Sequence, residues 1–222
     1  MSESLVECVD LARTYGQGQT AVVAVEAVTC AVGRDARIAL TGPSGSGKST
    51  LLHLFAALDA PTGGSIGWPA WPGSPASRPG LVGVVFQGPS LLMPLDVAEN
   101  VALPLLLAGV SPDEARTRAA KALDRAGVAD LAPRLPEELS GGQAQRVTVA
   151  RVFASEPQLI LADEPTGQLD ARHRDQVVDM LIQAADALQA GLVIATHDRR
   201  VADRLDTQWT MDDGRLQREP AC

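Results

Sequence analysis

The sequence contains the glycine-rich segment Gly42-Pro43-Ser44-Gly45-Ser46-Gly47-Lys48-Ser49-Thr50, between an apolar run at 37–40 and another at 49–58. The first run is typical of a buried strand and the second of a helix. Glycines let the backbone curl until its N–H groups point at phosphate oxygens, and the positive end of the following helix adds to the attraction. All nine residues are therefore candidates for nucleotide binding, with Lys48 on the β and γ phosphates and Ser49 on Mg²⁺. An ordinary turn rich in glycine and serine is the alternative, and the flanking strand and helix disfavour it.

Two acidic residues follow a second apolar strand. Asp163 and Glu164 come directly after the apolar run 159–162. A carboxylate at this place can hold Mg²⁺, usually through water, and a second can orient and polarise the attacking water. Acidic residues also end strands without any role, but a phosphate-binding loop in the same chain favours the functional interpretation. We expect Asp163 to be a metal ligand and Glu164 the principal base.

A second phosphate site is predicted at Leu139-Ser140-Gly141-Gly142-Gln143, which opens a helix. A serine hydroxyl, backbone N–H groups and the helix dipole would all face an anion there. A plain helix cap is the alternative, but it needs only Ser140 and leaves both glycines unexplained. One chain has little use for two such sites on one γ-phosphate. Two chains placed head to tail would each complete the nucleotide site of the other.

These three motifs together, Walker A at 42–50, LSGGQ at 139–143 and Walker B at 159–164, resemble the nucleotide-binding subunit of an ABC transporter. The resemblance covers essentially the whole chain. It implies an α/β fold, in which a RecA-like P-loop NTPase core carries an N-terminal antiparallel β subdomain and an inserted α-helical signature subdomain. It also implies Mg²⁺-dependent hydrolysis of ATP, a second copy of the chain as partner in an ATP-sandwich dimer, and integral-membrane permease subunits.

The resemblance also assigns roles to single residues. Tyr15 resembles the aromatic residue that stacks on adenine, and Gln87 the Q-loop glutamine that contacts Mg²⁺ and senses the membrane partner. His197 resembles the switch histidine near the γ-phosphate, which makes it catalytic together with Glu164 and Lys48. Asp170 lies in the D-loop, which contacts the opposite subunit. Taken alone, Tyr15 is a core aromatic, Gln87 a loop residue and His197 a capped surface histidine.

The chain is organised as a single ABC ATPase domain, 1–222. Strands alternate with helices in 1–87 and 156–222, which form the expected core. Helices dominate 88–155, where Asp96 caps a helix through Leu107 and a capping box at 111–114 opens another that ends at Gly127. This segment is the predicted helical subdomain.

The amino-acid composition and the distribution of apolar residues argue against several other classes of protein. The chain has 45% hydrophobic residues, and 19 basic against 27 acidic side chains give a net charge of −8, which argues against nucleic acid as a partner. The three cysteines, Cys8, Cys30 and Cys222, have no metal-ligand spacing and suit a reducing compartment. The N-terminus lacks a signal-peptide layout, and the longest apolar run, 101–110, is too short for a membrane helix. We expect a cytoplasmic protein, peripheral on the inner face of the membrane through its permease.

A finer resemblance concerns the direction of transport. Residues 162–170, with Gln168 where Asn is usual, and 99–105 resemble the branch of lipoprotein-releasing, macrolide-exporting and cell-division ATPases. This favours an export or mechanotransmission complex. An amino-acid-type importer and a regulatory cell-division ATPase without substrate are alternatives. A non-transport ABC ATPase of DNA repair or translation is disfavoured, because the chain has one cassette and no long insert between Lys48 and Ser140.

Two loops, at 66–82 and 90–95, are apolar or proline-rich enough to suggest a role in packing or partner binding. Residues 66–82 are short and proline-rich, and we expect a trimmed loop with Trp68 and Trp71 lying on the core; a partner contact is the alternative. The apolar segment 90–95 after Gln87 is expected to be exposed, where a helix of the membrane partner could dock.

Overall fold

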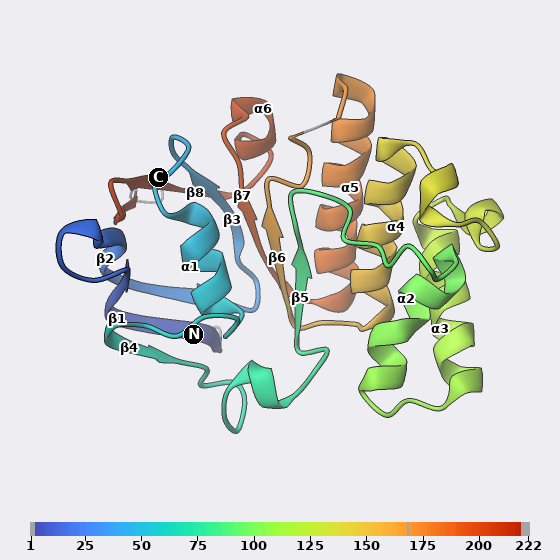
Figure 1. The fold of residues 1–222 in the computed structure, drawn as a ribbon, viewed down its shortest axis with the longest axis horizontal. Helices are drawn as coiled ribbons and strands as arrows, with labels where there is room; N and C mark the ends of the chain where they lie inside the picture. Colours follow the sequence, from blue (N-terminus) through green and yellow to red (C-terminus); the bar gives the residue numbers. More distant parts are fainter. Residues whose placement is uncertain (1–2, 168, 219–222) are drawn as a thin grey trace.

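The computed structural model describes residues 3–167 and 169–218, and in these residues the strands form two sheets (Figure 1). The strands are β1 (Ser4–Tyr15), β2 (Val22–Gly33), β3 (Arg37–Thr41), β4 (Gly63–Gly67), β5 (Val82–Val85), β6 (Leu159–Asp163), β7 (Gly191–Ala195), β8 (Thr207–Asp212) and β9 (Arg215–Arg218). The helices are α1 (Lys48–Phe55), α2 (Val97–Leu107), α3 (Pro112–Arg125), α4 (Gly141–Ala154), α5 (Ala171–Leu188) and α6 (Arg199–Ala202). Short 3₁₀ turns lie at Gly18–Thr20, Pro75–Ser77, Ala129–Leu131 and Pro136–Glu138.

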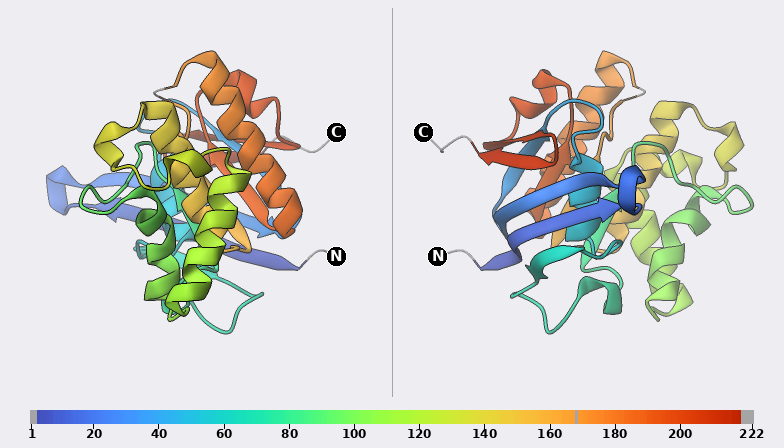
Figure 2. Two further views of the ribbon diagram at one scale, coloured as in Figure 1. Left: turned by 90° about the vertical axis from the view of Figure 1, so that its right-hand side faces the viewer. Right: turned by 60° about the vertical axis from the view of Figure 1, so that its left-hand side comes forward.

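The larger sheet has the strand order β5-β6-β7-β3-β8-β9, and all neighbours are parallel except β8 and β9. The smaller sheet is antiparallel, with the order β2-β1-β4, and faces the viewer in the right-hand view of Figure 2. This is the α/β fold with an antiparallel β portion that the sequence predicts. The β8–β9 hairpin turns at Asp213 and Gly214.

Apolar residues fill two cores, one on each face of the larger sheet. Along β6, Ile160 and Ala162 belong to the core shared with α4 and α5, whereas Leu159 and Leu161 belong to the core shared with α1 and the smaller sheet. Parallel strands covered on both faces have near-continuous apolar sequences, because every side chain meets a packed layer. The carboxyl ends of the central strands are left at one edge, where loops can carry polar groups.

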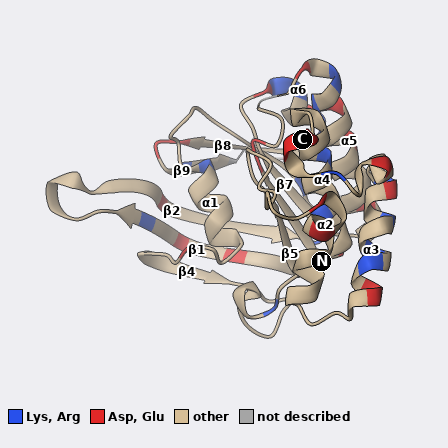
Figure 3. Cartoon of the chain, turned by 45° about the vertical axis from the view of Figure 1, so that its right-hand side comes forward, with Lys and Arg blue, Asp and Glu red and all other residues tan. Residues whose placement is uncertain are grey.

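Helices α2, α3 and α4 pack beside this sheet and form the helical part of the molecule (Figure 1). Asp96 begins α2 with a full capping box to Glu99. At α3 the structure gives only half of the predicted capping box, the bond from the Glu114 N–H to Ser111 Oγ at 3.4 Å. Charged residues are frequent along α3, α5 and α6 (Figure 3). None of the helices in the described part of the chain is long and apolar enough to cross a bilayer.

Helix α1 ends earlier than predicted, and both α1 and α5 end where a residue other than glycine adopts a left-handed backbone conformation. Helix α1 stops at Phe55, since Ala57 has φ +54° and the Leu58 N–H bonds back to the carbonyl of His53. Helix α5 stops at Leu188, since Gln189 has φ +51°. Such endings usually use glycine, so the sequence carried no signal for them.

The proline-rich loop lies on the core, as expected. Trp71 is buried and its Nε1 donates to Gln158 Oε1 at 2.9 Å, while Trp68 donates to the carbonyl of Phe55 at 3.0 Å. Cys8 and Cys30 are buried and lie opposite each other on β1 and β2. Gln168 and Cys222 lie outside the described residues.

The segment after Gln87 is only partly exposed, which corrects one prediction. Leu92 and Met93 are 47% and 54% exposed, but Leu91 packs against the core of the helices. The buried side chain of Asn100 holds the segment, since it accepts from the Leu92 N–H at 2.7 Å and donates to the carbonyls of Leu92 and Leu95. The exposed apolar surface is therefore smaller than the sequence suggests.

Candidate functional site

The glycine-rich loop runs from the end of β3 to the start of α1, as predicted, and close neighbours make glycine obligatory at two of its positions. A Cβ on Gly42 would lie 2.1 Å from the carbonyl oxygen of Met211 on β8. A Cβ on Gly47 would lie 2.0 Å from the carbonyl oxygen of Ala24 on β2. Both glycines also have positive φ, +140° and +100°. The loop is thus clasped between the two sheets, which fixes its shape before any ligand binds.

Lys48 is the best-defined member of this loop. Its side chain is buried, and its Nζ donates to the carbonyls of Gly42 and Pro43, each at 2.9 Å. The ammonium group therefore lies beneath the curl of the loop. Ser46 is also buried, and its hydroxyl has no hydrogen-bond partner among the described residues.

A cleft of about 520 Å³ opens over the loop. It is lined by residues from the loop, from β2 and from the segments that follow β5, β6 and β7: Ala24, Ser44, Gly45, Gly47, Lys48, Ser49, Thr50, Gln87, Glu164 and His197. In open parallel sheets, ligands bind outside the carboxyl ends of the strands, where these segments meet. The structure thus brings Lys48, Ser49, Gln87, Glu164 and His197 together, as the sequence predicts.

Glu164 and His197 form a direct pair that the sequence analysis did not identify. The Nδ1 atom of His197 lies 2.9 Å from each carboxylate oxygen of Glu164. The Glu164 side chain is 14% exposed and that of His197 69% exposed. The Glu164 N–H donates to the carbonyl of Ala195, and its φ of +45° turns the chain sharply after β6. Only the strand order could have predicted the Glu164–His197 pair. Asp163 and Ala195 are paired across β6 and β7, so the residues that follow the two strands lie close together.

The residues expected at a magnesium site are compatible with that ion. Asp163 ends β6, and its Oδ1 is buried without a hydrogen-bond partner among the described residues. Ser49 and Gln87 line the cleft and offer a hydroxyl and an amide oxygen. Mg²⁺ takes oxygen ligands and keeps several waters, so one carboxylate with two neutral oxygens suits it.

Tyr15 ends β1 on the smaller sheet and is not among the residues that line this cleft. Its hydroxyl donates to Asp59 Oδ2 at 2.6 Å, and the guanidinium of Arg13 lies 4.6 Å from its ring centroid and ion-pairs with Asp59 at 2.8 Å. Burial raises the pKa of Asp59, but hydrogen bonds from Tyr15 and the Ala60 N–H and the charge of Arg13 outweigh it, so the pKa lies below its ordinary value. With 39% exposure, Tyr15 is a surface aromatic rather than a core one.

The segment 139–143 also lies outside the cleft, and it forms a real helix cap. Ser140 Oγ accepts from the Gln143 N–H at 3.3 Å, and Gln143 Oε1 accepts from the Ser140 N–H at 2.9 Å. A Cβ on Gly142 would lie 2.8 Å from the ring of His173 on α5, so this glycine has a reason within the chain. Our expectation that a cap leaves both glycines unexplained was therefore wrong for Gly142. Around Gly141 the space is open.

Asp170 begins α5 and holds the same histidine. Its Oδ1 accepts from the His173 N–H at 3.0 Å, and its Oδ2 lies 2.8 Å from His173 Nδ1. These bonds lower the pKa of the Asp170 carboxyl, the backbone N–H of His173 first and its side chain second. The start of α5 therefore supports the start of α4 through one imidazole ring.

Comparison with known proteins agrees with this geometry. The family model described as "ABC transporter" matches residues 25–167. A solved dimeric structure of the ATP-binding cassette MJ0796, bound to ADP and Pi after hydrolysis, is 32% identical with a TM-score of 0.87 and covers 97% of this chain and 98% of its own. CbiO1 of Clostridium perfringens, part of the ABC transporter complex cbiONQ, is 27% identical with a TM-score of 0.85 and covers 99% of this chain and 89% of its own. The chain therefore belongs to the ABC transporter family, as one of its ATP-hydrolysing cassettes.

Proposed function

We propose that the cleft is the site of Mg²⁺-dependent ATP hydrolysis. The observation that supports this proposal is that the Glu164–His197 pair lines the same cleft as the loop 42–50. The loop N–H groups and Lys48 bind the phosphates, and Ser49, Gln87 and Asp163 hold the metal ion. When bound, Mg²⁺ supplies positive charge that neutralises the charge developing on the phosphates.

Glu164 is the principal base in this proposal, and His197 contacts the γ-phosphate. The Nδ1–H of His197 donates to the Glu164 carboxylate, which keeps that carboxylate turned toward the cleft. The largely exposed ring leaves Nε2 accessible, and Nε2 donates to a phosphate oxygen when it carries a proton as well as Nδ1. Positioning and charge neutralisation carry most of phosphoryl transfer, and both are supported by groups already in place.

We infer further that two copies act together, head to tail. The segment Ser140–Gln143 and Tyr15 lie outside the cleft, and Ser140 and Gly141 are exposed. In a second copy, Ser140, Gly141, Gly142 and Gln143 would close over the nucleotide held by 42–50, while Asp170 would face the opposite chain. The dimeric state of MJ0796 supports this arrangement.

We also propose a separate integral-membrane permease as partner, which would hold the chain at the inner, cytoplasmic face of the membrane. Residues 88–155 would act as one helical unit that transmits dimer closure to the permease. The place of CbiO1 in a transporter complex supports such a partner. The motif likeness at 162–170 and 99–105 favours an export or mechanotransmission complex. The alternatives are an importer of amino-acid type and a cell-division-type ATPase without substrate.

The test of the active site is Glu164→Gln, with Glu7→Gln on the exposed side of β1 as the matched control. We expect Glu164→Gln to lose at least about a hundredfold in kcat, because a general base contributes on that scale, and to retain ATP in a stable dimer. Phosphate release and size-exclusion chromatography measure both. A Glu164→Gln protein that hydrolyses ATP at the native rate would refute the assignment.

The direction of transport is tested by purifying the tagged chain from its host membrane in mild detergent. A co-purifying permease with four membrane helices and a large extracytoplasmic domain would support the exporter branch. A compact permease with a companion solute-binding protein would make the chain an importer subunit.

A further inference from the structure

Besides its contact with Glu164, the largely exposed His197 ring depends on its chain neighbours for its position. Thr196 is fully buried, and its N–H donates to the carbonyl of Leu40 on β3. The Asp198 N–H then donates to Thr196 Oγ1 at 3.0 Å. The direction in which His197 leaves β7 therefore depends on how Asp198 is held.

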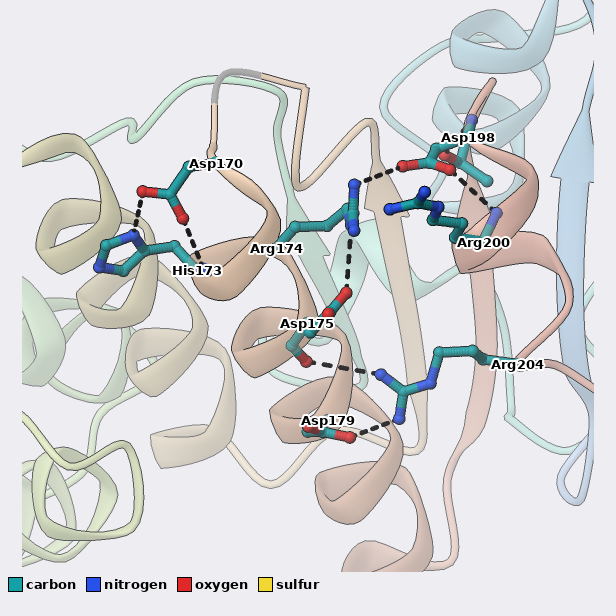
Figure 4. Close-up of polar contacts among 9 residues, drawn as sticks. Asp170, His173, Arg174, Asp175, Asp179, Asp198, Arg200 and Arg204 are labelled. Carbon is teal, nitrogen blue, oxygen red and sulfur yellow. Dashed lines mark hydrogen bonds and ion pairs between the residues drawn. The ribbon is translucent and has the colours of Figure 1, made fainter.

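Asp198 is held by an arginine from a different helix. Its Oδ2 accepts from Arg174 Nη1 at 3.1 Å, while its Oδ1 accepts from the Arg200 N–H at 2.9 Å and so caps α6 (Figure 4). The Arg174 side chain is only 14% exposed, and its Nε donates to Asp175 Oδ1 at 3.1 Å. A planar guanidinium fixed by two carboxylates has little freedom to move.

Arg174 also lies between the segment 139–143 and the segment that carries His197. Its N–H bonds to the carbonyl of Asp170, in the first turn of α5. The residue before it, His173, packs on Gly142 at the start of α4, and Arg174 itself reaches the turn that carries His197. Two adjacent side chains of one helix thus support the 139–143 segment and the His197 segment.

We propose that Arg174 is a positioning residue, which acts through Asp198 to hold His197 against Glu164. The proposal rests on the role of His197 proposed above. Loss of Arg174 removes the side-chain donor of the Asp198 carboxylate, leaves only the bond from the Arg200 N–H, and frees the turn after β7 to shift. The His197 Nδ1–Glu164 bond then forms in only part of the molecules.

The same pair of elements offers a matched control. Arg204 follows α6 and ion-pairs with Asp179, which lies about one and a half turns after Arg174 on α5. It also donates to the carbonyl of Asp175 (Figure 4). Removal of this pair costs the same α5–α6 segment an ion pair but leaves Asp198 and His197 untouched. A merely structural role for Arg174 would make the two variants alike.

The experiment compares Arg174→Met with Arg204→Met in the full-length protein. We expect Arg174→Met to lose about tenfold in kcat for ATP with KM changed less than about twofold, because misplacement of a catalytic group acts on the chemical step. Arg204→Met should keep the native kcat. Asp198→Asn is the second variant, since asparagine still caps α6 but lacks the charge that pairs with Arg174. It should resemble Arg174→Met.

The second readout is the imidazole NMR spectrum. The chain has three histidines, His53, His173 and His197, so the signal missing from His197→Ala identifies His197. We expect the nitrogen shifts of His197 to report a fixed Nδ1–H tautomer in the native protein and in Arg204→Met, and a mixture of tautomers in Arg174→Met. A native His197 signal and native kcat in both Arg174→Met and Asp198→Asn would overturn the positioning role. A fully active His197→Ala would instead overturn the proposed function.

Discussion

The imidazole of His173 lies directly against the α-carbon of Gly142, so that a methyl group at residue 142 would come within 2.8 Å of its Cδ2. This contact joins the first turn of α4 to the first turn of α5. Asp170 bonds to Nδ1 of the same ring, so the His173 side chain cannot easily move away from Gly142.

The contact predicts that Gly142→Ala destabilises the chain. The added methyl group must displace His173 or α4, and overpacking of this kind costs about 1–3 kcal/mol in the free energy of unfolding. Gly141→Ala is the matched control, because the space there is open and alanine favours the helix; it should leave stability unchanged or raise it slightly. Urea unfolding measures both. The double change Gly142→Ala with His173→Ala should recover part of the loss, and equal effects of the two glycine changes would contradict the contact.

The Tyr15–Asp59–Arg13 cluster predicts a pH dependence. Because the folded-state pKa of Asp59 is lowered, its ionised form favours the folded chain at pH values above the ordinary carboxyl pKa of 3.8, and this contribution disappears as the pH falls through the folded-state pKa. Asp59→Asn should therefore be less stable than the native chain at pH 7, and the difference should shrink as the pH falls below 3.8. Urea unfolding of both proteins from pH 7 downward checks this. A stability difference that stays constant over this range would contradict it.

The buried ammonium of Lys48 predicts a labelling pattern. The chain has two lysines, and Lys121 lies exposed on α3, whereas Lys48 is bonded to two carbonyls beneath its loop. An amine-reactive acetylating reagent should modify Lys121 first, and ATP should slow modification of Lys48 alone. Mass spectrometry of digested samples measures both rates. In binding assays, Lys48→Ala should lose at least about tenfold in ATP affinity, since a charge-assisted contact to phosphate is worth 1.5–3 kcal/mol, and Lys121→Ala should bind normally.

A fourth prediction concerns Arg151 on α4, whose pKa is lowered by burial. Its guanidinium donates to the carbonyl of Ser90 at 2.7 Å and to Ser90 Oγ at 2.6 Å. Arg151→Met leaves that carbonyl without its donor and should cost about 1–3 kcal/mol of unfolding free energy. Ser90→Ala removes only the hydroxyl contact and should cost less. Equal losses in thermal or urea unfolding would show that the carbonyl contact contributes nothing.

Local signals in the sequence were sufficient for much of the fold. The loop at 42–50, the caps at Asp96 and Ser140 and the apolar strands depend on neighbouring residues, and their places follow from short-range backbone chemistry. The side-chain contacts that position the residues of the candidate site depend instead on residues distant in sequence. Neither the Glu164–His197 pair nor the Arg174–Asp198 pair has a local signature, since each requires knowing which strands and helices lie side by side.

Several other residues have contacts or backbone conformations that the local sequence does not predict. Asp59 carries no motif, yet it receives the hydroxyl of Tyr15 and the charge of Arg13. Ala57 and Gln189 end helices in a conformation that usually needs glycine. Leu91 looks like part of an exposed apolar run, but Asn100 turns its segment onto the core. In each case a tertiary contact outweighed the local preference.

The two cores on opposite faces of the larger sheet differ in their optical properties. All three tryptophans, Trp68, Trp71 and Trp209, pack into the core that contains α1, and the segment 88–155 contains no tryptophan. Tryptophan fluorescence therefore follows the unfolding of the core on one face of the sheet, whereas circular dichroism follows mainly the helices on the other face, since most helical residues lie there. If the two signals change at different urea concentrations, the cassette unfolds in two steps, and the fluorescent step belongs to the half that carries the phosphate loop.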